Sequence, residues 1–439
     1  MQFIYLILSI YLGRRNPLYY LIFPMALVSG PGAFIDSRTV LFGNDIFLIG
    51  KNIYKDVITL YLFLVVFHLR KYWTRNMITN TPIFSYSFYI LFLIVFTFLF
   101  SGTNDEAINV MRLFIHMILG YYFITFIFSA ANFKQFIQFF NTLFFATGIL
   151  SICYVLNSAK IFPFFIQENL YQEIEMGGSS FFRDFSTIPY FSHLLFLLAF
   201  SLTLLKSKVF NSKALILVLA TYPFVLLYTF TRSLLGITFI ECILIVVLIA
   251  MKYPKRIFSF KTLGIAFILF FSIAIIQLSL KNELSFFTER ISSAKSEGIE
   301  ENNVAIRIAY HIKAYEILNS SNALLLGDGV NKKHESEMDE VGAWAADSSI
   351  PFLLIYTGFI GVFFYFYIHF NFLFKIYGQI EDHFNAISLT LFVTTISFIL
   401  SSLFMGGIRW GDPFIFFPLV LVVTVGNLIK KENFLEISK

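Results

Sequence analysis

The chain has 439 residues, of which 58% are hydrophobic and 13% charged, with a net charge of +5 and a mean hydropathy of +0.76. Soluble domains carry about 25% charged residues, so this composition excludes an ordinary soluble protein and predicts a polytopic helical membrane protein. The basic surplus is the kind that orients membrane helices, so it does not indicate nucleic-acid binding. Both cysteines lie in apolar runs, which argues against a disulfide or a metal site.

Apolar stretches recur along the whole chain, and a transmembrane helix needs about 20 such residues. Twelve stretches qualify: 17–35, 51–69, 83–101, 106–128, 134–157, 187–205, 213–230, 233–251, 261–280, 347–373, 384–405 and 412–429. Residues 2–12 form a thirteenth, which is short and would have to be tilted, re-entrant or extended through mismatch. We therefore predict one all-α transmembrane domain over residues 1–439, with about 12–13 helices.

The lysines and arginines fall mainly on alternate connections, which predicts the orientation of the chain. One side holds 17 of the 32: Arg14, Arg15, Arg70, Lys71, Arg75, Lys134, Lys206, Lys208, Lys213, Lys252, Lys255, Arg256, Lys261, Lys375, Lys430, Lys431 and Lys439. The positive-inside rule makes that side the cytoplasm and places the C-terminus there. Two long connections, 158–186 and 281–346, then lie outside.

Arginines on the outer side are candidate ligands for pyrophosphate, because the guanidinium group is always charged and binds phosphate through two hydrogen bonds at once. The candidates are Arg112, near the outer end of a span, and Arg183, Arg232, Arg290, Arg307 and Arg409 in or beside outer connections. For each of them the alternative is snorkelling to the interface or a structural ion pair. Arg183, for example, is followed directly by Asp184.

The largest connection, 281–346, contains a predicted amphipathic helix over residues 303–318. Val304, Ile308, Ile312 and Tyr315 recur at helical spacing, which suits a helix lying on the outer membrane surface. Arg307 and His311 are four residues apart, so they share one side of this helix. The run Gly327-Asp328-Gly329 predicts a turn at its end.

Transfer of a glycosyl group needs a base for the acceptor hydroxyl and a stabilised leaving group. Asp347 follows the long loop directly at the water–membrane boundary, and His311 is the second candidate base. Asp347 is also well placed to cap the following helix, a role compatible with catalysis.

Other features indicate structure rather than chemistry. The charged run 332–340 matches no metal-ligand spacing and is interpreted as a solvated loop, so we expect neither a metal nor a cofactor. The chain has no nucleotide-binding or Ser-His-Asp motif. His68 and His193 lie in or near spans and are interpreted as structural. Glu241, inside a span, is the residue that best argues for transport; its alternative is a hydrogen-bonded contact between helices.

Four segments together resemble the superfamily of bacterial inner-membrane O-antigen polymerases and O-antigen ligases. They are Phe181-Phe182-Arg183 before a span, Phe230-Thr231-Arg232-Ser233-Leu234-Leu235-Gly236 in a tight outer hairpin, Ala305-Ile306-Arg307 with the following helix and Leu326-Gly327-Asp328-Gly329, and Asp347-Ser348-x9-Gly358-x-x-Gly361. Their order and the number of spans extend the resemblance over most of the chain. Ligases of the family have a histidine where Asp347 stands, which favours a polymerase.

The resemblance implies a reaction and a location. The donor would be an undecaprenyl-pyrophosphate-linked glycan, transferred on the periplasmic side to an incoming lipid-linked repeat unit, with release of undecaprenyl pyrophosphate. Arg232, Arg290 and Arg307 would neutralise the pyrophosphate, and Asp347 or His311 would activate the acceptor. The expected partners are these lipid-linked glycans and the inner-membrane bilayer, with a chain-length regulator as a further candidate. The alternatives are an O-antigen ligase acting on lipid A–core and a lipid-linked sugar transporter or flippase.

Overall fold

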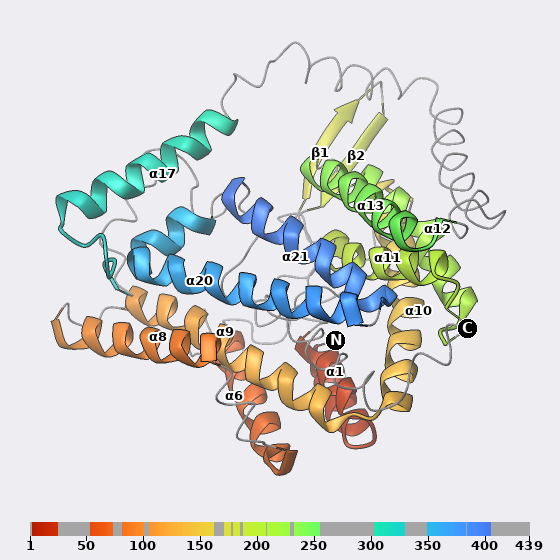
Figure 1. Ribbon diagram of the computed structural model, residues 1–439, viewed down its shortest axis with the longest axis horizontal. Helices are drawn as coiled ribbons and strands as arrows, with labels where there is room; N and C mark the ends of the chain where they lie inside the picture. Colours follow the sequence, from red (N-terminus) through yellow and green to blue (C-terminus); the bar gives the residue numbers. More distant parts are fainter. Residues whose placement is uncertain are drawn as a thin grey trace.

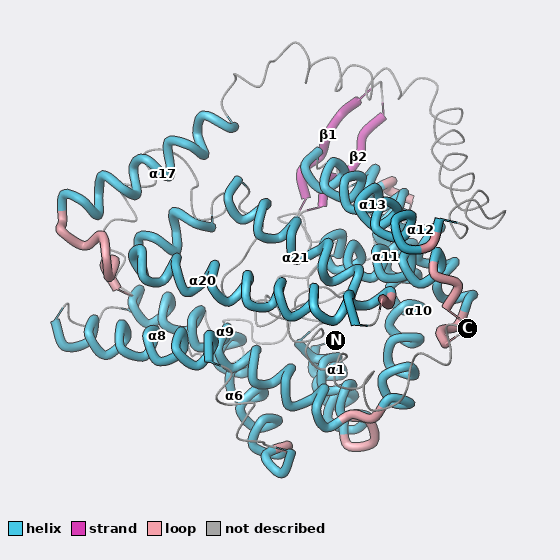
Figure 2. Tube along the Cα trace, in the orientation of Figure 1, coloured by secondary structure: helices cyan, strands magenta, loops and turns pink. Residues whose placement is uncertain are grey.

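The computed structural model describes residues 2–24, 53–72, 81–100, 105–161, 171–176, 179–184, 188–207, 209–228, 232–254, 303–329, 349–382 and 384–404. These parts of the chain are mainly helical (Figures 1 and 2). The elements are α1 (Gln2–Gly13), the 3-10 helices η1 (Pro17–Leu21) and η2 (Arg70–Tyr72), α6 (Ile53–His68), α8 (Thr81–Phe100), α9 (Asp105–Ala130), α10 (Phe133–Ser158), β1 (Tyr171–Met176), β2 (Ser179–Asp184), α11 (Ile188–Leu204), α12 (Ser212–Tyr228), α13 (Arg232–Lys252), α17 (Asn303–Ser320), α20 (Ser349–Asp382) and α21 (Ala386–Phe404).

The predicted apolar stretches correspond closely to these helices. Each of the stretches from 51–69 to 233–251, together with 347–373 and 384–405, falls on one helix, and residues 2–12 form α1. The stretches 261–280 and 412–429 lie outside the described residues. By length and composition, three of the described helices are able to cross a membrane, namely Pro82–Leu99, Phe133–Ser158 and Leu353–Glu381. These helices are compatible with a membrane protein.

The connection 158–186 contains an element that the all-α prediction omitted. Strands β1 and β2 pair antiparallel, with Tyr171 opposite Asp184 and Met176 opposite Ser179. Arg183 therefore lies on a strand, opposite Gln172. Two glycines, Gly177 and Gly178, separate the strands in the sequence, and such a dipeptide between two β-prone runs is a hairpin signal.

Helices α20 and α21 lie between two groups of helices (Figure 1). Helix α20 packs against α8 on one side and α21 on the other, and α21 in turn packs against α11 and α13. Most buried positions are aliphatic or aromatic, and phenylalanine is prominent among them, as in Phe123, Phe126 and Phe144. Close packing of these side chains contributes to the helix contacts through dispersion attraction.

Large apolar side chains also cover the outward faces of the helices. Met251 is 78% exposed, Leu99 72% and Phe374 71%. Soluble monomers rarely expose so many large hydrophobic residues in contiguous patches. These outward faces are compatible with a hydrocarbon environment around the helices.

Polar contacts join several basic connections of the chain to neighbouring elements. The Asn16 side chain donates to the backbone carbonyl of Gln135, and the Gln135 side chain donates to the carbonyl of Arg15. Asn211, between Lys206 and Lys213, donates its backbone N–H to the Asn141 side chain. The Lys252 ammonium lies 5.3 Å from the ring centre of Phe384, in the connection after α20.

Candidate active site

Helix α20 is broken at Gly358, which has φ 60° and ψ −169°. In an unbroken helix the N–H of residue 359 would bond to the carbonyl of residue 355. Here the Phe359 N–H donates instead to Leu324 O, at 2.9 Å, and the Ile360 N–H donates to Leu325 O, at 3.2 Å. The break therefore exposes backbone donors that a second segment of the chain satisfies.

The carbonyls freed by the break also have partners. The Asp328 N–H donates to Ile355 O at 2.8 Å, and the Tyr89 hydroxyl of α8 donates to Thr357 O at 2.6 Å. Backbone groups that a helix break leaves unpaired inside a protein need other partners. The segment 323–329 and Tyr89 provide these groups, so the turn after α17 fits into the break of α20.

Two glycines allow this close approach. A Cβ atom on Gly327 would lie 2.6 Å from the Gly358 nitrogen and 2.7 Å from Ile355 O, and Gly327 has φ +69°. A Cβ atom on Gly358 would lie 2.5 Å from the Gly327 nitrogen and would also collide with Leu325 O. Only glycine fits at both positions. The motifs Gly327-Asp328-Gly329 and Gly358-x-x-Gly361 thus form one structural unit.

Helix α17 leads into this turn and packs on α20 (Figure 1). Tyr310, Ala314, Ile317 and Leu318 form its buried face. The predicted apolar stripe is a different face, since Ile308 is 52% exposed and Ile312 53%. The helix therefore has two apolar faces, one packed on protein and one free to meet lipid, where the sequence had suggested a single stripe.

Of the two candidate residues on α17, the structure describes the side chain of His311 but only the backbone of Arg307. His311 is partly exposed and takes part in contacts within the protein. Arg307 precedes His311 by one turn, and residues 307, 311, 314 and 318 form one row along the helix. The docked turn thus fixes the position of the helix that carries Arg307 and His311.

The other predicted site residues are only partly covered by the structure. Arg232 is the first residue of α13, Arg112 lies in α9 and Arg183 in β2; their backbone is described, their side chains are not. Asp347, Arg290 and Arg409 lie outside the described residues. The convergence of all these groups on one pyrophosphate stays a prediction.

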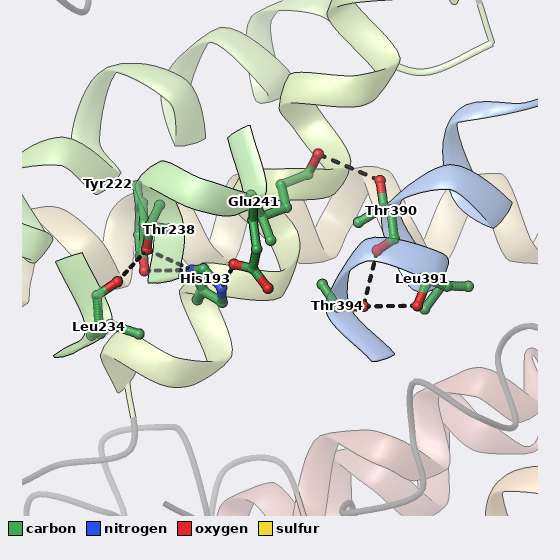
Figure 3. A network of polar contacts seen from close by, with 9 residues as sticks. His193, Tyr222, Leu234, Thr238, Glu241, Thr390, Leu391 and Thr394 are labelled. Atoms are coloured by element: carbon green, nitrogen blue, oxygen red, sulfur yellow. Dashed lines mark hydrogen bonds and ion pairs between the residues drawn. The ribbon is translucent and has the colours of Figure 1, made fainter. Parts of the chain in front are cut away.

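A second polar cluster lies between α11, α12 and α13 (Figure 3). His193 Nε2 lies 2.5 Å from Glu241 Oε2. His193 Nδ1 lies 3.0 Å from the Tyr222 hydroxyl and 3.1 Å from Thr238 Oγ1. Glu241 is 1% exposed, and Thr238 and Tyr222 are also buried.

His193 Nδ1 faces two hydroxyl groups, those of Tyr222 and Thr238. The Thr238 hydroxyl also donates to Leu234 O of its own helix at 2.7 Å. Which groups donate and which accept at Nδ1 depends on the tautomer of the ring.

The prediction that His193 is structural did not include its acidic partner on α13. The signal was present in the sequence, because an acid and a histidine in neighbouring apolar stretches are expected to pair. The contributions of Tyr89 and of the carbonyls of Leu324 and Leu325 had no such signal, since backbone pairing across a helix break depends on tertiary structure.

No protein-family model matches the chain, and no curated protein matches it.

Proposed function

We propose that this protein is a surface-polysaccharide polymerase of the O-antigen type, a polytopic enzyme of the bacterial inner membrane. It would join undecaprenyl-pyrophosphate-linked repeat units on the periplasmic side and release undecaprenyl pyrophosphate. The observation that carries the proposal is the docking of the turn 323–329 into the break of α20 at Gly358. Two separate segments of the family resemblance meet there, and they position the helix of Arg307 and His311.

Contacts near the ends of the helices support the orientation on which the proposal depends. Residues 15 and 16, in a connection that the positive-inside rule assigns to the cytoplasm, bond to Gln135 at the start of α10, and Asn211 bonds to Asn141 in the first half of α10. Gly329 of the large connection lies against the Thr97 side chain near the end of α8. In the proposed orientation the first set of contacts is on the cytoplasmic side and the last is on the outer side.

The proposed reaction follows from the chemistry of the groups involved. The acceptor hydroxyl attacks the anomeric carbon of the donor, the bond from that carbon to the pyrophosphate oxygen breaks, and the hydroxyl proton passes to His311 or Asp347. Guanidinium groups of Arg232, Arg290 and Arg307 neutralise the charge that develops on the leaving pyrophosphate. Attack opposite the leaving group inverts the anomeric centre.

The exposed apolar face of α17 fits a lipid-linked substrate. Ile308, Ile312 and Tyr315 lie on the side away from α20, as in a helix immersed in the outer leaflet. Such a helix would keep Arg307 at the depth of lipid phosphates. The donor and acceptor then reach the site sideways from the membrane.

Transport is the less favoured reading. The sequence argument for transport is the isolated acidic residue Glu241, and the contact between its carboxylate and the His193 ring gives that residue an interhelical role. Transfer to lipid A–core differs from polymerisation only in the acceptor.

The polysaccharide ladder of cells that lack this gene tests the proposal, with wild type or Arg307→Ala supplied in trans. We expect core carrying a single repeat unit, with the ladder restored by wild type alone. Bare core with accumulated lipid-linked polymer would identify a ligase. An unchanged ladder would rule out a role in O-antigen assembly.

A further inference from the structure

The buried face of α13 changes character along its length. Leu234, Thr238, Glu241, Ile245 and Ile249 follow one another at helical spacing, and all are buried. The inner part of this stripe is aliphatic, whereas its outer part carries Thr238 and Glu241. Aliphatic contacts alone define the rotation and depth of a helix less sharply than paired polar groups do.

The His193–Glu241 pair ties α13 to a helix that is itself held in place. Thr390 of α21 donates to Ser201 of α11 at 2.8 Å. Helix α11 is therefore fixed to α21 through Ser201 and to α13 through His193. Tyr222 connects α12 to the same histidine, because its hydroxyl lies within hydrogen-bond distance of His193 Nδ1.

Arg232 begins α13, nine residues before Glu241. At a rise of about 1.5 Å per residue, Glu241 lies roughly 13 Å further along the same helix. A straight helix transmits rotation and depth over this distance. We propose that His193 and Glu241 are positioning residues that hold the outer end of α13, and with it Arg232, in the place where Arg232 meets the pyrophosphate group.

The effect of this positioning on catalysis rests on the proposed function. The contacts that hold α13 in place do not. The titratable residues nearest the pair along the described helices are Tyr190 and His193 on α11, Tyr222 on α12, and Glu241 and Cys242 on α13. Helix α21 contains no titratable residue. The contact between His193 and Glu241 therefore joins an acidic and a basic side chain from two neighbouring helices.

The first arm of the test does not use activity. Arg232 is replaced by cysteine in a background with Cys153→Ala and Cys242→Ala, and the rate of modification by a polar maleimide is measured in membranes. We expect Glu241→Gln and His193→Gln each to change this rate several-fold. Ser192→Ala, a buried neighbour of His193 outside the cluster, is the matched control and leaves the rate unchanged.

The second arm measures polymerisation with Arg232 intact. Glu241→Gln is expected to lower kcat/KM by roughly 10- to 100-fold, because displacement of a positioned group by about 1 Å has an effect of that order. The exchange His193→Glu with Glu241→His should recover part of the activity and of the wild-type maleimide rate. Size-exclusion chromatography checks that each variant is folded.

The two arms test the positioning role and the proposed function separately. A maleimide rate that stays the same in both single variants overturns the positioning role, whatever the activity. A wild type that does not polymerise overturns the proposed function, and the maleimide rates then decide the positioning role alone.

Discussion

Tyr89 supplies a single hydroxyl to the point where α20 is broken. Its oxygen lies 2.6 Å from Thr357 O, and that carbonyl is buried. Tyr86 lies one turn earlier on α8, is also buried, and has no hydrogen-bond partner for its hydroxyl among the described residues. The two tyrosines therefore differ mainly in the bond at the break.

We expect Tyr89→Phe to lower the free energy of unfolding by about 1–3 kcal/mol, because it leaves a buried carbonyl without a donor. Tyr86→Phe loses no such bond and should leave stability unchanged or slightly higher. Thermal unfolding of the two purified variants in the same detergent measures the difference. Equal melting temperatures would show that the Tyr89 hydroxyl does not stabilise the break.

The break in α20 is the main feature at the scale of elements. Alanine at position 358 would have an unfavourable positive φ, and its Cβ would press on the backbone of the turn 323–329. We expect Gly358→Ala to destabilise the protein by about 2–4 kcal/mol. It should also release α17, which limited proteolysis of the large connection would detect.

Gly378 in the same helix is the control, because a Cβ there has nothing within 4 Å. Gly378→Ala is expected to be neutral or stabilising by about 0.5–1 kcal/mol, since alanine reduces the freedom of the unfolded chain. Similar effects of the two substitutions would contradict the close packing of the turn in the break.

The elements also show how far a sequence can be interpreted alone. The apolar stretches predicted most helix positions, because lipid and core burial both require long apolar runs. The face of α17 that packs on α20 was not predicted: Tyr310, Ala314, Ile317 and Leu318 are no more apolar than Ile308, Ile312 and Tyr315. Which of two apolar faces packs on protein depends on the neighbouring helix.

Within the candidate site, the sequence indicated the glycines and Arg307 but not their arrangement. The motif around Gly327 and the motif around Gly358 appeared as two separate signals. The two motifs meet through backbone hydrogen bonds from Phe359 to Leu324 and from Asp328 to Ile355. Backbone hydrogen bonds of this kind cannot be predicted from the residue types.

At the scale of the whole molecule, the orientation of the chain is open to direct test. Single cysteines are placed at Arg14, Lys206 and Leu325 in a background without Cys153 and Cys242; all three positions are exposed. We expect a membrane-impermeant maleimide to label the cysteine at 325 in intact spheroplasts, and those at 14 and 206 only after lysis. Labelling of position 206 from outside would contradict the proposed orientation.

The most direct test of the central claim uses the purified protein in lipid nanodiscs with undecaprenyl-pyrophosphate-linked repeat units. The account predicts lipid-linked products that grow by whole repeat units, with release of undecaprenyl pyrophosphate and loss of both products in Arg307→Ala. Repeat units that remain single with the folded wild-type protein, or polymerisation that persists in Arg307→Ala, would contradict it.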